Sequence, residues 1–178
     1  YDDAWANLYL SSNITAGDAA TSTINSQITL NGSRTITVDI DSTLNINGKV
    51  TSWAGAGSGI TKNGDGTLAL SAANSYTGLT DITTGTLAAS NSTALGSGGW
   101  SSSSMTRIRD GATLALQGNI TLDEHMHMVG SGVGDLGALR SISGDNTLSM
   151  TNTNSGSGPG LAIDGNTTIG VDAGTLTV

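Results

Sequence analysis

Residues 58–90 read SGITKNGDGTLALSAANSYTGLTDITTGTLAAS and contain two short runs in which side chains of different character alternate. The runs are Thr67-Leu68-Ala69-Leu70 and Thr86-Leu87-Ala88-Ala89, and each follows a glycine. Successive side chains of a strand point to opposite faces, so alternation at period two predicts short strands. Glycine supplies the positive φ that a tight turn requires. The stretch therefore predicts turn, strand, turn and strand, without a helix.

A short residue followed by Thr and Leu occurs both in this stretch and well outside it. The threonines of the six triplets are Thr43, Thr67, Thr86, Thr113, Thr147 and Thr175. The first four are separated by 24, 19 and 27 residues. Recurrence of one strand unit every 20–30 residues or so is typical of a solenoid or β-helix. The uneven spacing indicates rungs whose loops differ in length while their strands stack.

These residues give the stretch a clear family resemblance. It resembles the autotransporter-associated β-strand repeat, also called the passenger-associated transport repeat, with Ile60 in place of the usual Leu. The matching positions are Gly59, Lys62, Gly64, Gly66, Thr67, Leu68, Leu70, Asn74, Tyr76, Gly78, Thr80, Ile82, Gly85 and Leu87. The resemblance extends over nearly the whole chain from about Asn25 and is sharpest at 59–90. It implies a right-handed parallel β-helix in a large secreted or surface-displayed bacterial protein, and it implies no enzymatic chemistry.

Composition limits the classes of structure and partner. Phe is absent and aromatic residues make up 3% of the chain, so the core must be aliphatic. Gly is abundant at 26 residues, but Leu, Ile and Val fall at alternate positions in short runs, as half-buried strands require and disordered chains do not. The net charge of −8 excludes the basic surface typical of proteins that bind nucleic acid or anionic membranes. No Cys is present, so disulfides do not stabilise the fold.

We expect one β-helix segment over residues 1–178, all-β and of roughly eight rungs if a rung averages about 22 residues. Its parts would be N-terminal rungs over 1–57, the best-matched repeat at 58–90, and C-terminal rungs with longer loops over 91–178. Loops are expected at 91–104, which contains Trp100, and at 152–160, and Trp5 is expected to cover one end of the core. No run of about 18 apolar residues and no signal peptide is visible.

One cluster has the residue types of a metal site. Asp123, His125 and His127 would project from one face if residues 123–128 formed a strand, with about 7 Å between neighbours. No second group of ligands is visible elsewhere in the chain. We therefore expect a solvated polar face there, with Met126 and Met128 packed inward, and we expect no metal, cofactor or catalytic residues.

The function expected from these observations is structural. The chain would be a non-catalytic stalk or adhesin scaffold in an exported, cell-surface passenger, and its repeat would assist secretion by folding outside the cell. Because Val178 ends within an expected strand, its partners would be flanking rungs of a longer chain or further copies of itself. A host or surface glycan is a further expected partner. The alternatives are a filament subunit that stacks head to tail and a carbohydrate-active β-helix.

Overall fold

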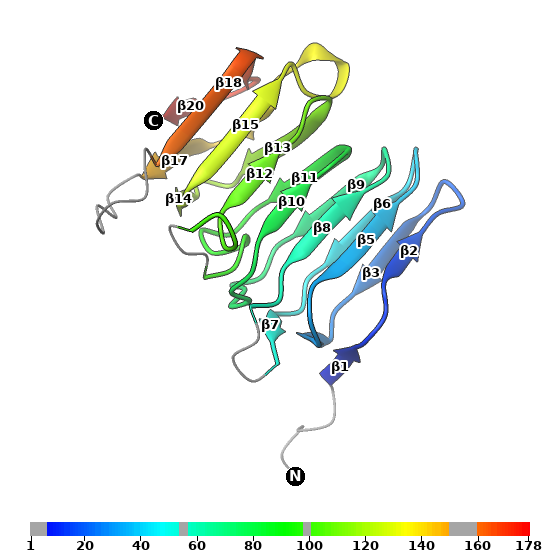
Figure 1. Ribbon diagram of the computed structural model, residues 1–178. Coiled ribbons are helices and arrows are strands. Elements are labelled where there is room, and N and C mark those ends of the chain that lie inside the picture. Colours follow the sequence, from blue (N-terminus) through cyan, green and yellow to red (C-terminus); the bar gives the residue numbers. More distant parts are fainter. Residues whose placement is uncertain (1–6, 54–56, 98–100, 150–159) are drawn as a thin grey trace.

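The chain winds into a parallel β-helix in the computed structural model, which describes residues 7–53, 57–97, 101–149 and 160–178 (Figure 1). Every strand pairing in these residues is parallel, and each strand pairs with its counterpart in the rung before or after. In Figure 1 the front strands ascend while successive rungs move leftward, which is the sense of a right-handed coil. Trp5, Trp100 and most of the loop expected at 152–160 lie outside the described residues.

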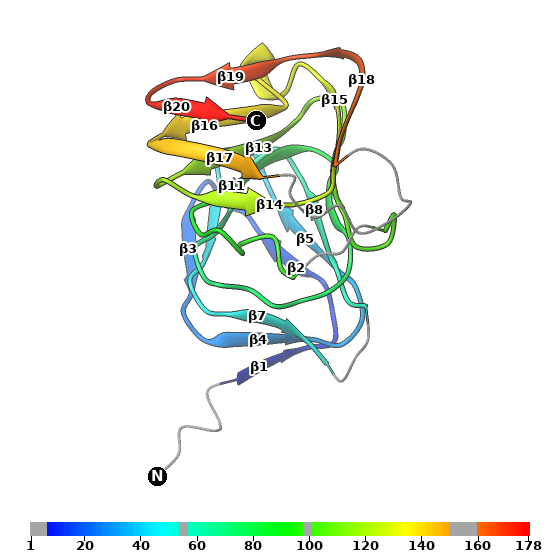
Figure 2. The same ribbon diagram turned by 90° about the vertical axis from the view of Figure 1, so that its left-hand side faces the viewer.

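Three faces enclose the core, as the turned view shows (Figure 2). The first long sheet contains β2 (Ile14–Ala16), β5 (Arg34–Val38), β8 (Ile60–Asn63), β10 (Thr80–Ile82), β12 (Thr106–Ile108), β15 (Met126–Gly130) and β18 (Leu161–Thr167). The second contains β3 (Thr21–Ile24), β6 (Thr43–Ile46), β9 (Thr67–Leu70), β11 (Gly85–Ala89), β13 (Ala112–Gln117), β16 (Leu139–Ser143) and β19 (Ile169–Val171).

The third face is built from two short sheets. One contains β1 (Asn7–Leu10), β4 (Gln27–Leu30) and β7 (Val50–Ser52), and the other β14 (Thr121–Asp123), β17 (Asp145–Ser149) and β20 (Thr175–Thr177). A single 3-10 turn, η1 (Val133–Asp135), lies before β16 among the described residues. Within those residues no helix is long and apolar enough to cross a membrane.

Four of the six Thr-Leu triplets stack as their spacing predicts. Thr43, Thr67, Thr86 and Thr113 are direct register partners in consecutive strands of the second long sheet. Their loops absorb the unequal spacing. The triplets at Thr147 and Thr175 are exceptions, because they lie in β17 and β20 on the third face, where Thr147 pairs with Thr121 and Thr175 with Asp145. The triplet therefore marks a strand of the β-helix without specifying which face that strand occupies.

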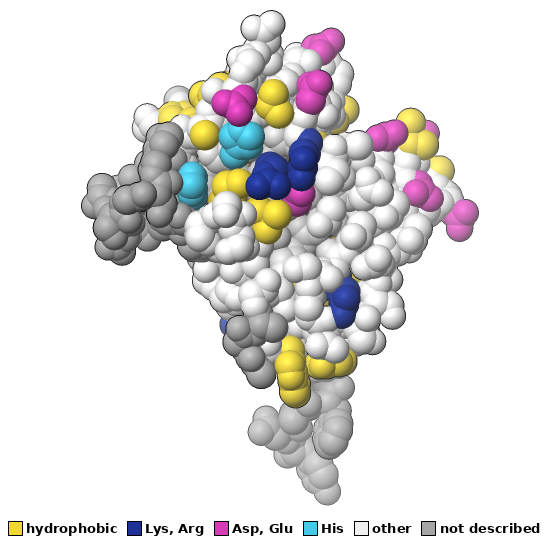
Figure 3. All heavy atoms as spheres, in the orientation of Figure 1, with side chains coloured by type: hydrophobic (Ala, Val, Ile, Leu, Met, Phe, Trp, Pro, Cys, Tyr) yellow, Lys and Arg dark blue, Asp and Glu magenta, His cyan; other side chains and the backbone are white. Residues whose placement is uncertain are grey.

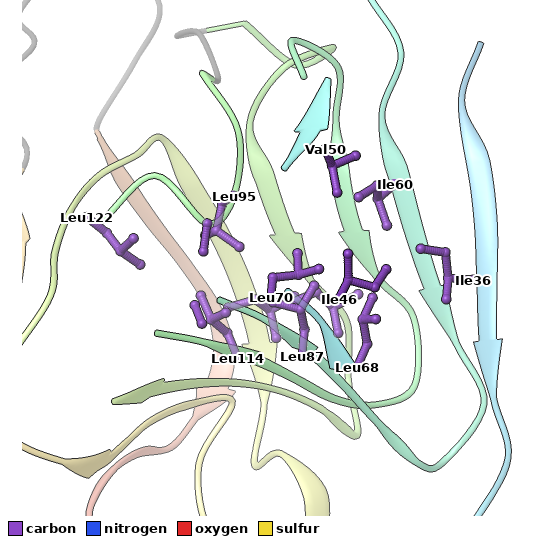
Figure 4. Packing of buried hydrophobic residues seen from close by; sticks show 14 of the residues in the cluster. Ile36, Ile46, Val50, Ile60, Leu68, Leu70, Leu87, Leu95, Leu114 and Leu122 are labelled. Carbon is purple, nitrogen blue, oxygen red and sulfur yellow. The ribbon is translucent and has the colours of Figure 1, made fainter. Parts of the chain in front are cut away.

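The leucines that follow these threonines form the centre of the core. Leu44, Leu68, Leu87 and Leu114 pair in register, and each is at most 2% exposed. Figure 4 shows Leu68, Leu87 and Leu114 converging with Leu70. Burying one such side chain contributes about 1.5–3 kcal/mol. The core is aliphatic as composition predicts, except that it also contains the aromatic ring of Tyr76.

The strand expectations were less complete at the two ends. Each long sheet has seven strands in the described residues, so the expected count of roughly eight rungs is not confirmed. Sequence reasoning missed β2, β3 and β18. β3 and β18 are largely exposed and β2 is partly buried. All three are rich in polar or small residues, so their alternation of apolar and polar side chains is faint.

Candidate functional site

The glycines of the repeat lie where neighbouring rungs approach each other closely. A Cβ added to Gly64 would lie 2.3 Å from the carbonyl oxygen of Val38 in the preceding rung. One added to Gly85 would lie 2.4 Å from the carbonyl oxygen of Gly64. Both residues also have positive φ, at 76° and 66°. Real Cβ atoms essentially never come within 3.0 Å of such atoms, so these positions require glycine for two independent reasons.

Three further motif glycines show the close approach without the positive φ. For Gly59, Gly66 and Gly78, the nearest backbone oxygen to an added Cβ would lie at 2.2, 2.2 and 2.5 Å. In each case the oxygen belongs to an adjacent rung or turn. The glycines of residues 59–90 therefore lie where the backbones of neighbouring rungs are in contact and leave no room for a side chain.

Lys62 is an inward-facing cation within an otherwise apolar column. It pairs in register with Ile36 in one rung and Ile82 in the next, and it is 0% exposed. Its Nζ donates hydrogen bonds to three backbone carbonyl oxygens, of Asn63 at 3.1 Å, Gly64 at 2.6 Å and Thr84 at 3.1 Å. The side chain thus satisfies carbonyls at the β8–β9 corner and at the next rung.

Burial lowers the pKa of Lys62 to about 8, and the nearby carboxylate of Asp65 partly opposes this decrease. A buried ammonium group is costly unless it is fully hydrogen-bonded, and the three carbonyls supply that compensation. The interaction ties two rungs together at the turn where the motif has its Lys-x-Gly-x-Gly pattern.

Asn74 bridges rungs where the third face is interrupted. Its Oδ1 accepts a hydrogen bond from the Val50 amide at 2.8 Å, and its Nδ2 donates to the Ala94 carbonyl at 2.7 Å. The side chain is 4% exposed, so it completes backbone pairing that β-strands provide elsewhere. One motif residue therefore connects three consecutive turns of the coil.

Tyr76 begins a chain of polar groups inside the core. Its hydroxyl forms a 2.8 Å hydrogen bond with the Thr80 hydroxyl, and both residues are at most 1% exposed. Thr80 is the register partner of Thr106, whose hydroxyl donates to the Glu124 carboxylate at 3.4 Å. Burial is the main cause that raises the pKa of the Tyr76 hydroxyl.

Glu124 lies at the far end of this polar chain and is 8% exposed. Desolvation raises the pKa of its carboxyl to about 8; the Thr106 hydrogen bond opposes the increase and the charge of Asp123 adds to it. Sequence reasoning did not identify Glu124 as a buried group. Its position at the corner between β14 and β15 becomes visible only once the chain is folded.

The remaining motif residues have plain structural roles. Leu68, Leu70, Leu87 and Ile82 are fully buried, while Thr67 points outward in the row of stacked threonines. All fourteen motif positions identified from the sequence are described, and the structure brings them together over β8 to β11 and the loop between β9 and β10.

The candidate metal ligands do not share one strand. Asp123 ends β14 on the third face, whereas His127 lies within β15 on the first long sheet. The chain turns a corner at Glu124 and His125, so the geometry expected for a straight strand is wrong. His127 instead bonds Asp164 through Nε2 at 2.6 Å. Within the part of the chain that the structure describes, no group of three or more His, Asp or Glu side chains could hold a metal ion.

Comparison with known proteins gave one match. No curated protein and no solved structure matched the chain. Residues 60–89, from the start of β8 to the end of β11, match the family model described as the passenger-associated-transport-repeat. This confirms the resemblance for the segment that contains the rung-to-rung contacts. The chain therefore carries a passenger-associated transport repeat at residues 60–89, which indicates an autotransporter passenger domain and so a secreted or surface-exposed protein.

Proposed function

We propose that this chain is a non-catalytic structural segment of an exported passenger, acting as a stalk or adhesin scaffold at the cell surface. The observation that carries the proposal is that the repeat residues make contacts between rungs. Gly64 and Gly85 leave room for the backbone of a neighbouring rung to approach closely. Lys62 and Asn74 form hydrogen bonds with backbone groups of two or more rungs. These residues stabilise the coil only after the rungs have stacked.

This property supports a role in secretion. A chain that crosses a pore unfolded gains these contacts only on the far side, where consecutive rungs can form. Ordering the backbone costs about 1–2 kcal/mol of free energy per residue. The contacts between stacked rungs offset this cost, so a folded segment does not readily unfold and slide back through the pore. Residues 59–90 would form the first strongly interlocked segment, because the inward side chains of β9 and β11 are buried, whereas most side chains of β1 and β3 are exposed.

The test measures how fast a passenger containing this chain reaches the cell surface, followed by protease accessibility after a pulse of synthesis. Deletion of residues 59–90, or the double substitution Gly64→Ala and Gly85→Ala, should slow surface appearance. Gly57→Ala is the matched control, because an added Cβ there meets nothing within 4 Å and φ is not positive. Export of the deletion variant at the rate of the intact passenger would refute the secretory role.

The proposed partners are further rungs. Ile163, Ile169 and Val171 are 40–49% exposed, whereas their register partners in the preceding rung are all buried, namely Met128, Leu139 and Ser141. A rung of the same polypeptide, or a second copy, would cover these side chains by continuing the parallel pairing. A non-catalytic role further predicts that incubation with the protein leaves the viscosity of polysaccharide solutions unchanged.

A further inference from the structure

A hollow of about 460 Å³ lies on the outer face of the first long sheet, over β12 and β15. Figure 3 shows this face, where Arg and His side chains gather beside an apolar patch. The polar side chains that line the hollow are Arg107, Arg109, His125 and His127, and Val129 and Ala162 contribute apolar surface. Its volume falls within the range of about 300–1,000 Å³ that is common for small-ligand sites.

The charge distribution at this hollow differs from that of the rest of the chain. The sequence has a net charge of −8 and contains only six Lys and Arg residues and two His. Two of those six and both histidines line this one hollow. All four can donate N–H hydrogen bonds, and none of the residues that line the hollow is acidic.

The acidic residues nearby are already engaged by other groups. Asp81 is the register partner of Arg107, yet its two carboxylate oxygens accept from Arg109 at 2.9 and 2.8 Å. His127, on the other side of Arg107, bonds Asp164. Both interactions run diagonally across the sheet.

These two diagonal interactions leave Arg107 without an acidic partner from either neighbouring strand. Arg107 as a whole is half-buried, and among the described residues its guanidinium forms no hydrogen bond and no ion pair. Arg107 lines the hollow, so its N–H donors are available there without an acceptor from the described part of the chain.

We propose that this hollow binds a small organic monocarboxylate with an apolar body. The carboxylate accepts two parallel hydrogen bonds from the Arg107 guanidinium, the geometry that gives Arg–carboxylate pairs their strength. The body packs against Val129 and Ala162. The charge of −8 repels long polyanions, which favours a ligand with a single negative charge. The proposal is independent of the role in secretion.

The experiment is calorimetric titration of the whole chain at low salt with four probes: benzoate, glucuronate, acetate and glucose. Benzoate should bind. Glucuronate and acetate should bind more weakly, because the body of glucuronate is polar and acetate lacks a body, and glucose should not bind. Arg107→Gln should weaken binding about tenfold or more, since it removes a charged donor. Arg107→Lys, which retains the charge but not the paired donors, should recover only part of the affinity.

Arg140→Gln is the matched control. Arg140 is held by Asp172 through two hydrogen bonds of 3.0 and 2.6 Å on the second long sheet, so its loss should leave binding unchanged. Three results would overturn the proposal: no heat with benzoate, unchanged affinity in both Arg107 variants, or acetate or glucuronate binding as tightly as benzoate. Equal binding of acetate would mean an adventitious ion only. Arg107 lies on the outer face, and thermal unfolding of each variant verifies that it is folded.

Discussion

The buried carboxyl of Glu124 predicts how the stability of the protein depends on pH. Its pKa is raised from 4.5 to about 8, mainly by desolvation. The folded chain therefore binds more protons than the unfolded chain between these values, and the stabilisation present below pH 4.5 is lost as pH rises through about 8. At 1.36 kcal/mol per unit of pKa shift, this carboxyl would contribute about 5 kcal/mol more to the free energy of unfolding at low pH than at high pH. Partial access of water reduces this, so we expect a loss of about 2–5 kcal/mol.

Glu124→Gln tests this prediction, because Gln has nearly the same shape and can still accept the Thr106 hydrogen bond. The assay is urea unfolding followed by circular dichroism, with the free energy of unfolding extrapolated at about pH 5 and about pH 9. The free energy of unfolding of the wild type minus that of the variant should fall by about 2–5 kcal/mol between these two pH values. If the two proteins show parallel pH dependence, Glu124 does not titrate with a raised pKa and the reasoning fails.

Four further predictions follow from the rung contacts and the histidines. Gly85→Ala should cost about 2–5 kcal/mol of unfolding free energy in urea melts, from positive φ and the contact with Gly64, and a cost below 1 kcal/mol would contradict the close approach. Because the pKa of Lys62 is lowered, the unfolded chain binds more protons between about 8 and 10.5, so wild-type stability should rise over that range and Lys62→Met should lack the rise. Asn74→Ala should cost about 2–5 kcal/mol, since two buried backbone groups lose their partner, and an unchanged midpoint would contradict this. Replacing His125 and His127 with Ala should leave the heats of zinc titration unchanged.

The stacked core was predictable because its signal is local and repeated. Each short alternating run marks an inward leucine, and recurrence of the triplet identifies strands that pair with one another, as Leu68 and Leu87 do. The motif glycines were also visible in sequence. Their reason is not local, because the atoms that exclude a side chain at Gly85 belong to the preceding rung.

Corners and lateral neighbours could not be predicted in the same way. The turn at Glu124 and His125 lacks the glycine that marks other corners, so the sequence did not show that Asp123 and His127 lie on different faces. The hollow depends on register between strands 26 and 20 residues apart, which sets Asp81 beside Arg107 and His127 beyond it. Loop lengths fix that register, and nothing in either strand reveals it.

Hydrogen exchange of backbone amides would test the central claim most directly. If residues 60–89 interlock the coil, their amides should exchange most slowly, with a free energy of opening close to that of global unfolding. The amides of the exposed strands at 7–24 should exchange much faster. Gly85→Ala should speed exchange across β8 to β11 together. Exchange in 60–89 as fast as in 7–24 would contradict the account, because the repeat would then not be the segment that secures the fold.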